Sequence, residues 1–289
     1  MKNILKYAKD NIASFETGSV SSNEIRFFEY GGKKYVMKTP LMVGDHLSPF
    51  WFMMKKVFHY TIERQNASLG AVYHLLKDNP HIRVAPFIIA DESAMIYEFV
   101  EGNCWSGDEF PEGKDNAYKL GQYVGYNHQT AHKDCGILGI EDVTDFFPAA
   151  LSHMEECVNT YWNSDDVIDK KMRAFFERLR EHRFESSRYS LIMTDISADQ
   201  FLFDGKNIAA CVDLDAYVIG PVEWELSFLQ RFVADWDSFK AGYEAYQSMP
   251  AFEEMSDFFF YLMALNSYEN KSEIEMWWCP LLDKSSGKR

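Results

Sequence analysis

The chain contains 289 residues, of which 47% are hydrophobic and 25% are charged, a composition that excludes disorder and indicates a folded protein with a large core. Its formal net charge of −15 repels phosphate backbones and anionic lipid, so we expect no nucleic-acid and no membrane partner. Five cysteines without a close-spaced pair argue against a disulfide framework, and the lack of a signal peptide or of an apolar run near about 18 residues leads us to expect a cytoplasmic protein.

The first part of the chain predicts β, α and β elements in that order. Residues 20–38 are expected to form a hairpin, because β-prone side chains flank the turn at Gly31-Gly32. Apolar residues then recur at helical spacing over 49–76, which predicts one long helix or two short ones. Two further strand-like runs follow, at 84–90 and 94–100.

A domain boundary is expected at 101–114, where the composition shifts to Gly, Asp, Glu and Pro. This division gives an N-terminal lobe of residues 1–100 and a C-terminal lobe of residues 101–289. Helical patterns dominate the second lobe. The predicted helices are 117–132, 146–162, 166–183, 221–247 and 252–278.

One hairpin interrupts these helices, with predicted strands at 201–203 and 208–212. An acid stands at each of its open ends, Asp195 before the first strand and Asp213 after the second. Because the turn folds the chain back, we expect both carboxylates to emerge on the same side. Two such carboxylates can divide the work of deprotonating a hydroxyl and of holding a hard cation such as Mg²⁺. Asp215 can reinforce the same cation or structure the loop.

Charge is distributed unevenly along the chain. Residues 1–98 hold 12 basic and 10 acidic side chains, and the remainder holds 17 and 34, so the two parts carry +2 and −17. The first part therefore suits an anionic ligand and the second a cationic one, although an acidic surface also serves solubility alone. Acids of the late predicted helices contribute to this excess: Asp235, Asp237, Glu254 and Asp257.

The segment from Met193 to Phe203, followed by 212–215 and by Gly220-Pro221, resembles the catalytic half of the aminoglycoside phosphotransferase and choline kinase family. Members of this family are small-molecule kinases with a two-lobed, protein-kinase-like α+β fold. The resemblance implies a small antiparallel β lobe with one or two helices, and a larger, mostly helical lobe that contains a catalytic hairpin. It extends over residues 18–227.

The resemblance also implies roles for the acids of the hairpin. Asp195 matches the catalytic Asp of the family, and Asp213 matches the metal-binding Asp after the hairpin. Gln200 takes the position of a second metal ligand, an Asn in the family. Asp215 is the second acid of the Asp-x-Asp pair, and is a further candidate for the metal.

The N-terminal lobe carries candidate nucleotide-binding residues. Lys38 ends a predicted strand, as the phosphate-binding lysine of kinases does. We expect its carboxylate partner to be Glu63, the only acid between Asp45 and Asp78.

Two backbone segments complete the expected nucleotide site. Residues 18–23 are predicted to form the loop between the first two strands, where backbone N–H groups and the hydroxyls of Ser19 and Ser21 can meet phosphates. The segment with Glu98 and Val100 matches the hinge of the family, which receives the adenine.

The chain departs from the family pattern at three positions. Met193 replaces a structural His, Gln200 replaces Asn, and Glu225 stands where an Asp is commoner. These departures leave open an alternative, in which the chain is a catalytically degenerate member of the fold that binds nucleotide without turnover.

His128 and His132 raise a second alternative, a metal-dependent hydrolase. Their i, i+4 spacing on a predicted helix can direct both rings to one zinc ion. However, Gln129 stands where a metalloprotease has its general base Glu, and spacing reveals no third ligand. We therefore favour packing or hydrogen bonding within the helical lobe for these rings.

Together these patterns predict an enzyme that moves the γ-phosphoryl group of ATP, or of GTP, to a hydroxyl of a small, amine-bearing molecule such as an aminoglycoside or a choline-like amino alcohol. Lys38, steadied by Glu63, is expected to hold the triphosphate. Mg²⁺ carried by Asp213 and Gln200 is expected to neutralise its charge, and Asp195 to orient and deprotonate the acceptor.

Overall fold

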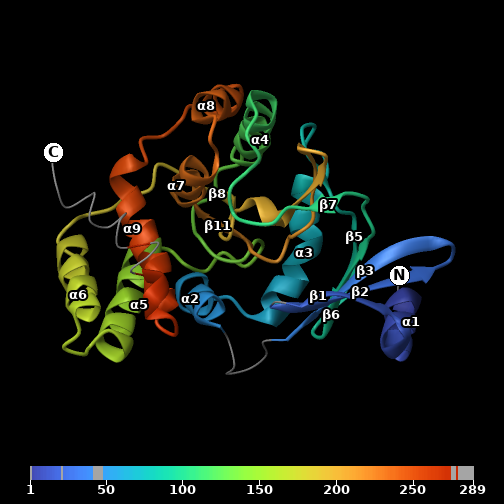
Figure 1. Ribbon diagram of the computed structural model, residues 1–289, viewed down its shortest axis with the longest axis horizontal. Coiled ribbons are helices and arrows are strands. Elements are labelled where there is room, and N and C mark those ends of the chain that lie inside the picture. The colour runs from blue at the N-terminus through green and yellow to red at the C-terminus, as the bar shows by residue number, and fades with distance from the viewer. Residues whose placement is uncertain (1, 21, 42–47, 275–277, 279–289) are drawn as a thin grey trace.

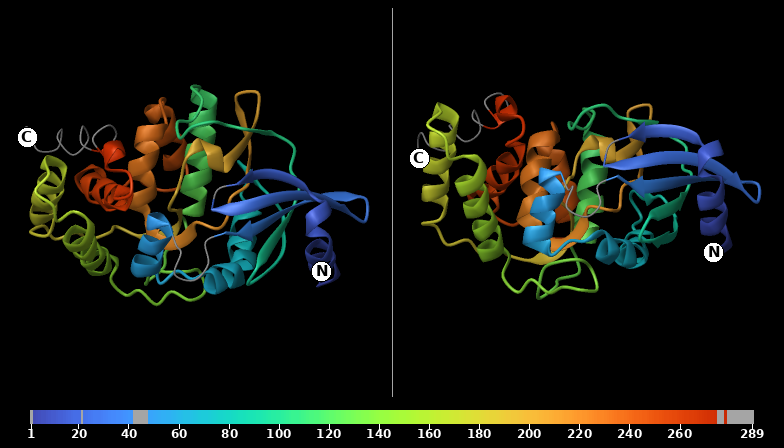
Figure 2. Two further views of the ribbon diagram at one scale, coloured as in Figure 1. Left: turned by 60° about the horizontal axis from the view of Figure 1, so that its bottom comes forward. Right: turned by 90° about the horizontal axis from the view of Figure 1, so that it is seen from below.

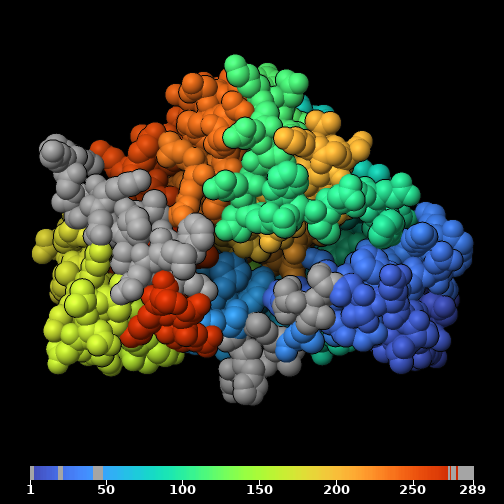
Figure 3. Space-filling view, in the orientation of Figure 1, coloured from blue at the N-terminus to red at the C-terminus, as the bar shows by residue number. Residues whose placement is uncertain are grey.

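A computed structural model of the chain describes residues 2–20, 22–41, 48–274 and 278. A β-sheet forms one end of the molecule and a group of helices forms the other, and this division is visible from all sides (Figures 1 and 2). In the space-filling view, helices α5 (Phe146–Tyr161) and α6 (Val167–Leu179) lie at the end farthest from the sheet (Figure 3). The predicted α+β, protein-kinase-like fold class is confirmed.

The N-terminal sheet is antiparallel, with strand order β1-β2-β3-β6-β5. The predicted hairpin consists of β2 and β3, and Gly31 and Gly32 both have positive φ in its turn, as a tight two-residue hairpin requires. Helix α1 (Lys2–Asn11), which the sequence did not predict, covers one face of the sheet. The strands are β1 (Glu16–Val20), β2 (Asn23–Tyr30), β3 (Lys33–Pro40), β5 (Phe87–Asp91) and β6 (Ala94–Glu98).

The predicted helical region 49–76 forms two helices, α2 (Pro49–Phe58) and α3 (Ile62–Leu76). Between them His59 adopts a left-handed conformation with φ of 52°, and the Tyr60 N–H donates to the Met54 carbonyl at 3.2 Å. The chain therefore turns sharply. Helix α3 packs against β5, whereas α2 packs among the helices of the other lobe, next to α5 (Figure 1).

Most helices of the second lobe match the prediction, with three corrections. The predicted helix 117–132 ends at Asn127, so His128 and His132 do not lie on a common helix. The predicted helix 221–247 is two helices, because the chain turns at residues 233–235, where Asp235 begins the second one. The predicted helix 252–278 ends at Ala264, and residues 275–277 lie outside the described ranges. The remaining helices are α4 (Lys114–Asn127), α7 (Val222–Phe232), α8 (Trp236–Glu244), α9 (Glu253–Ala264) and α10 (Lys271–Glu273).

None of the helices in the described ranges is long and apolar enough to cross a bilayer.

The predicted hairpin of the second lobe is present as β9 (Phe201–Asp204) and β10 (Asn207–Cys211). Short strands flank it, β4 (Arg83–Val84) beside β10 and β7 (Asn103–Cys104) beside β9. The strand pair β8 (Tyr189–Met193) and β11 (Tyr217–Pro221) was not predicted. Both strands are buried almost throughout, so they lack the alternating pattern that marks a half-buried strand.

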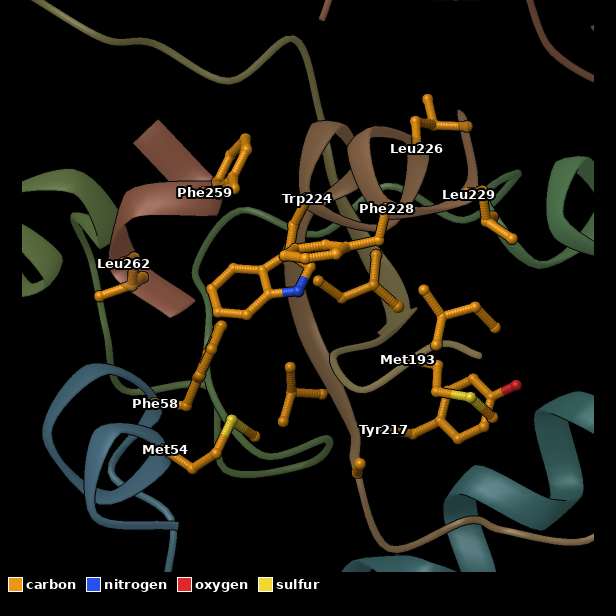
Figure 4. Close-up of a cluster of buried hydrophobic side chains, with 14 of the residues drawn as sticks. Met54, Phe58, Met193, Tyr217, Trp224, Leu226, Phe228, Leu229, Phe259 and Leu262 are labelled. Carbon is orange, nitrogen blue, oxygen red and sulfur yellow. The ribbon is translucent and has the colours of Figure 1, made fainter. Parts of the chain in front are cut away.

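Apolar side chains from distant segments pack beneath this strand pair (Figure 4). The Trp224 indole of α7 lies between Phe58 of α2 and Phe259 of α9, with ring-centroid distances of 5.9 and 5.7 Å. Its Nε1 donates to the Thr194 carbonyl at 2.9 Å. Burial of each such side chain contributes about 2–3 kcal/mol. The residue preceding Asp195 is therefore anchored on the largest core of the molecule.

Candidate active site

Strand pairing brings the acids of the second lobe together. Thr194, which precedes Asp195, is held at β11 by two hydrogen bonds to the Ala216 carbonyl, from its N–H at 3.1 Å and its hydroxyl at 3.0 Å. Gln200 connects the two open ends of the hairpin: its carbonyl accepts the Val212 N–H at 3.1 Å, and its Nε2 lies 3.5 Å from Asp195 Oδ2. The structure thus places Gln200 between Asp195 and Asp213.

Lys38 of β3 reaches across to these acids from the other lobe. Its Nζ forms ion pairs with Asp213 Oδ1 at 2.7 Å and with Asp215 Oδ1 at 3.4 Å. The Lys38 side chain is only 7% exposed, and its Nζ also lies 5.8 Å from the centre of the Tyr97 ring. A buried ammonium requires such partners, because desolvation without them is costly.

The structure does not bring Glu63 to Lys38. Glu63 is exposed in the first turn of α3, where hydrogen bonds from its own N–H and from Thr61 lower the pKa of its carboxyl. Thr61 reciprocates as the N-cap by accepting the Arg64 N–H at 3.2 Å. The expected Lys38–Glu63 pair is thus absent among the described residues, because Glu63 caps its helix and two acids of the second lobe take its place.

Asp195 has an unusual electrostatic environment. It is half-buried, and its Oδ1 has no hydrogen-bond partner among the described residues. Burial raises the pKa of its carboxyl to about 7, assisted by the negative charges of Asp215 and Asp199 and opposed by Lys38. A carboxylate with a pKa near neutrality is well suited to accept a proton.

Met193, which replaces the structural His of the family that the motif resembles, is held in place by core packing and by a backbone hydrogen bond. Its side chain is buried in the core, and its N–H donates to Glu225 Oε1 at 3.2 Å. The other oxygen of Glu225 lies 2.8 Å from His128 Nε2, and His128 Nδ1 lies 3.1 Å from the Tyr243 hydroxyl. His128 and Glu225 therefore support the strand that leads to Asp195, and the hydrogen bonding expected for His128 is present.

His132 has different surroundings. Its Nδ1 lies 3.4 Å from Glu141 Oε1, while His128 is directed to Glu225, so the two imidazoles do not converge on a common point. Within the described part of the chain, no group of three or more His, Cys, Asp or Glu side chains could hold a metal ion by itself. A site of the zinc-hydrolase kind is not formed by these residues.

The predicted phosphate loop 18–23 is shorter than expected. Gly18 and Ser19 belong to β1, Asn23 begins β2, and Ser21 lies outside the described residues. A Cβ at Gly18 would lie 2.8 Å from the Phe27 ring. Gly18 therefore permits close packing within the hairpin of β1 and β2 rather than a flexible loop.

The expected hinge lies between the lobes. The Glu98 N–H donates to the Pro86 carbonyl at 2.9 Å, and its carboxylate pairs with Lys33 at 3.0 Å. Val100 joins a small apolar cluster with Leu202 of the catalytic hairpin. Both side chains are buried, so this cluster packs the end of the hinge segment against the hairpin of β9 and β10.

Acids that were not predicted as site residues lie near Asp195. Asp199 affects the pKa of Asp195, and with burial it also raises the pKa of Asp108, whose carbonyl accepts the Ala198 N–H at 3.0 Å. Two of the late acids lie elsewhere: Glu254 and Asp257 line a groove together with residues of α6 and α9. Negative charge at the site therefore comes from the loops around Asp195.

Comparison with solved structures supports the fold assignment. Macrolide 2′-phosphotransferase MphH from Brachybacterium faecium superimposes with a TM-score of 0.56 and 12% identity, covering 99% of this chain and 95% of that one. Choline kinase LicA from Streptococcus pneumoniae gives a TM-score of 0.53 and 13% identity, covering 100% and 93%. A spectinomycin phosphotransferase in complex with ADP and spectinomycin gives 0.53 and 15%, covering 89% and 80%.

No curated protein matches the chain in sequence. Residues 71–258, however, match the Phosphotransferase enzyme family (APH), and this segment contains Asp195, the hairpin of β9 and β10, and Asp213. The match covers more than half of the chain, and the chain therefore belongs to the Phosphotransferase enzyme family.

Proposed function

We propose that this chain transfers the γ-phosphoryl group of ATP, or of GTP, to a hydroxyl of a small, amine-bearing acceptor. The observation that carries the proposal is the convergence of Lys38 from one lobe with Asp213 and Asp215 from the other, beside Asp195. Phosphoryl transfer requires mainly alignment and charge neutralisation, which a cation and several carboxylates at a lobe junction can provide. The ADP complex of the structurally similar spectinomycin phosphotransferase supports a nucleotide donor.

The donor set at this junction fits Mg²⁺. Asp213 is 26% exposed and offers a carboxylate, and Gln200 offers an amide oxygen, both hard ligands of the kind that this ion prefers. Few protein ligands suffice, because Mg²⁺ usually keeps several waters and binds substrate phosphates. When bound, the ion would supply positive charge to the transferring phosphoryl group.

In the proposed mechanism, Lys38 turns from Asp213 to the α- and β-phosphates, while the expected hinge with Glu98 and Val100 receives the base. Asp195 orients the acceptor hydroxyl and takes the hydroxyl proton as the new O–P bond forms. The nucleoside diphosphate leaves with the electron pair of the broken bond. Gln200 keeps Asp195 in place through Oδ2.

The acceptor class follows from charge. Asp199 lies close enough to both Asp195 and Asp108 for its negative charge to raise the pKa of each of these two carboxyls. Such a concentration of carboxylates favours a cationic acceptor over a neutral or anionic one. Aminoglycosides and choline-like amino alcohols both satisfy this requirement.

A screen for acceptor-stimulated ADP release tests the proposal. Aminoglycosides, amino alcohols and sugars are each offered with Mg²⁺-ATP or Mg²⁺-GTP to the wild type and to Asp195→Asn. We expect turnover with at least one amine-bearing acceptor and none with the variant. Nucleotide binding without turnover for any acceptor class would instead identify a degenerate member of the fold.

A further inference from the structure

A series of buried polar side chains runs from helix α4 to the loop that carries Asp213. The Tyr123 hydroxyl of α4 and the Tyr217 hydroxyl of β11 lie 2.9 Å apart, within hydrogen-bond distance. The Sγ atom of Cys211, the last residue of β10, lies 4.0 Å from the Tyr217 hydroxyl and 3.7 Å from the Asp213 carbonyl oxygen. The polar series Tyr123, Tyr217 and Cys211 thus ends at the backbone of Asp213.

These three side chains lie where apolar side chains would otherwise pack. Tyr123 and Tyr217 are each 1% exposed, Cys211 is fully buried, and all three belong to the largest apolar core. Figure 4 shows the Tyr217 hydroxyl directed away from the Trp224 indole. Burial of a hydroxyl is costly unless it is hydrogen-bonded, so each hydroxyl depends on its neighbours in the polar series.

The polar series can carry hydrogen bonds in one direction. Burial raises the pKa of the Cys211 thiol to about 12, so the thiol keeps its proton at neutral pH. The thiol can therefore donate to the Asp213 carbonyl and accept from Tyr217. The Tyr217 oxygen can in turn accept from Tyr123. Each of the three side chains then donates one hydrogen, and each hydrogen has an acceptor.

The backbone around Asp213 is held at one further point. The Val212 N–H donates to the Gln200 carbonyl at 3.1 Å. Together with the Cys211 thiol, this bond holds one peptide group on each side of Asp213. The Asp213 carboxylate lies 2.7 Å from Lys38 Nζ, so a small rotation of this backbone would displace the oxygens that the proposed function assigns to a cation.

We propose that Tyr123, Tyr217 and Cys211 form one hydrogen-bonded series that fixes the backbone of Asp213, and that they are positioning residues for the cation that Asp213 holds. This inference rests on the proposed function, which supplies that cation. The three side chains act through Asp213 and touch neither nucleotide nor acceptor. Their effect is therefore expected in the coupling between metal ion and nucleotide, and not in the binding of the nucleotide alone.

The test measures the Kd for ADP by calorimetry with and without Mg²⁺, so that no turnover is involved. The ratio of the two values is the gain in ADP affinity that the metal ion produces. We expect Tyr217→Phe to lower this gain about fivefold, near the value of one hydrogen bond, and to leave the Kd without Mg²⁺ within about twofold.

Tyr261→Phe is the matched control for this change. The Tyr261 hydroxyl is also buried, and it donates to the Met172 carbonyl at 2.8 Å, in helices at the other end of the molecule from the sheet. Loss of this bond is expected to lower the Tm and to leave the gain in ADP affinity unchanged. A merely structural role of Tyr217 would give the same result as the control.

Substitutions of Cys211 separate hydrogen bonding from packing. Cys211→Ser retains one donor and an acceptor, so it is expected to keep the gain within about twofold of the wild type. Cys211→Ala removes both and is expected to lower the gain as Tyr217→Phe does. Cys157→Ala, which removes a buried thiol of α5, is the matched control and is expected to leave the gain unchanged. This comparison decides the proposal if Tyr217→Phe does not fold.

An unchanged gain in Tyr217→Phe, or equal gains in Cys211→Ser and Cys211→Ala, would overturn the positioning role. An equal loss of gain in Tyr217→Phe and Tyr261→Phe would also overturn it. If the wild type shows the gain but phosphorylates no acceptor, the proposed function fails while the positioning role is still measured. If Mg²⁺ does not change the Kd for ADP in the wild type, this inference fails, and the acceptor screen still decides the proposed function.

Discussion

At the scale of single residues, the buried position of Asp195 favours proton transfer but disfavours its ionised form in the folded protein. Transfer of a proton from an acceptor requires a carboxylate with a pKa near the working pH, and burial together with the charges of Asp215 and Asp199 produces one. The same environment makes the ionised carboxylate unfavourable in the folded apoprotein. Activity and stability at this residue therefore depend on pH in opposite directions.

The activity should rise with pH as Asp195 ionises. Because the pKa of Asp195 is raised to about 7, we expect kcat/KM for the acceptor to fall about tenfold per pH unit below that value and to level off above it. The measurement is a pH profile of kcat/KM at saturating Mg²⁺ and nucleotide. A profile that stays flat down to pH 5 would assign proton transfer to a different group or show that Asp195 is ionised throughout.

The stability of the apoprotein should fall over the same range. An unfolded Asp ionises with a pKa of about 3.9, whereas folded Asp195 retains its proton until about pH 7, so its protonation stabilises the fold at low pH and this contribution is lost between those values. Asp195→Asn keeps the shape and remains neutral. We expect its Tm to exceed that of the wild type at pH 8 and the difference to shrink toward pH 4.5. Equal Tm differences at both pH values would contradict the raised pKa.

At the scale of elements, some strands and contacts of the structure could be predicted from the sequence and others could not. The hairpin of β9 and β10 was predictable because Asp204-Gly205 marks its turn and the resembling motif flanks it. Strands β8 and β11 were missed because full burial removes their alternation. Glu63 was assigned to Lys38 as the only acid in a helix, but an acid in a first turn also caps that helix, and sequence alone does not reveal which role prevails.

Helices α4 and α8 pack with their backbones in close contact, and glycine makes this possible. A Cβ at Gly242 would lie 2.1 Å from the Tyr118 carbonyl oxygen, and one at Gly121 would lie 2.0 Å from the Phe239 carbonyl oxygen. No side-chain rotation relieves a clash with backbone. We expect Gly242→Ala to lower the free energy of unfolding by about 3 kcal/mol or more, measured by urea denaturation.

Gly70 provides the matched control for this prediction. It is an exposed helical glycine in α3, and an added Cβ would meet only the Phe87 ring at 3.6 Å, an ordinary contact distance. Gly70→Ala should therefore raise the free energy of unfolding by about 0.5–1 kcal/mol, because alanine favours helix. Similar losses in both variants would show that the α4–α8 contact is not the determining factor.

At the scale of the whole molecule, the predicted boundary between the lobes at residue 100 does not separate two independent cores. Helix α2, which precedes that residue, buries Met53, Met54, Val57 and Phe58 in the core that also contains Trp224 and Phe259. Strand β4 pairs in parallel with β10 of the hairpin between Asp195 and Asp213. Lys38 and Asn23 form further contacts with Asp215. The helical lobe thus requires segments from the N-terminal part of the chain.

This interdependence predicts one cooperative unfolding transition. We expect urea transitions followed by tryptophan fluorescence and by far-UV circular dichroism to coincide, because six of the seven tryptophans lie in or against one core that helices from both parts of the chain share. A fragment of residues 101–289 should expose the surface that α2 covers and the edge of β10 that β4 occupies, and we expect it to be insoluble or to lack a cooperative transition. Two separate transitions in the full chain, or a cooperatively folded fragment, would show that the helical lobe builds its core without α2 and β4, and that their packing against it adds stability to a lobe that is already formed.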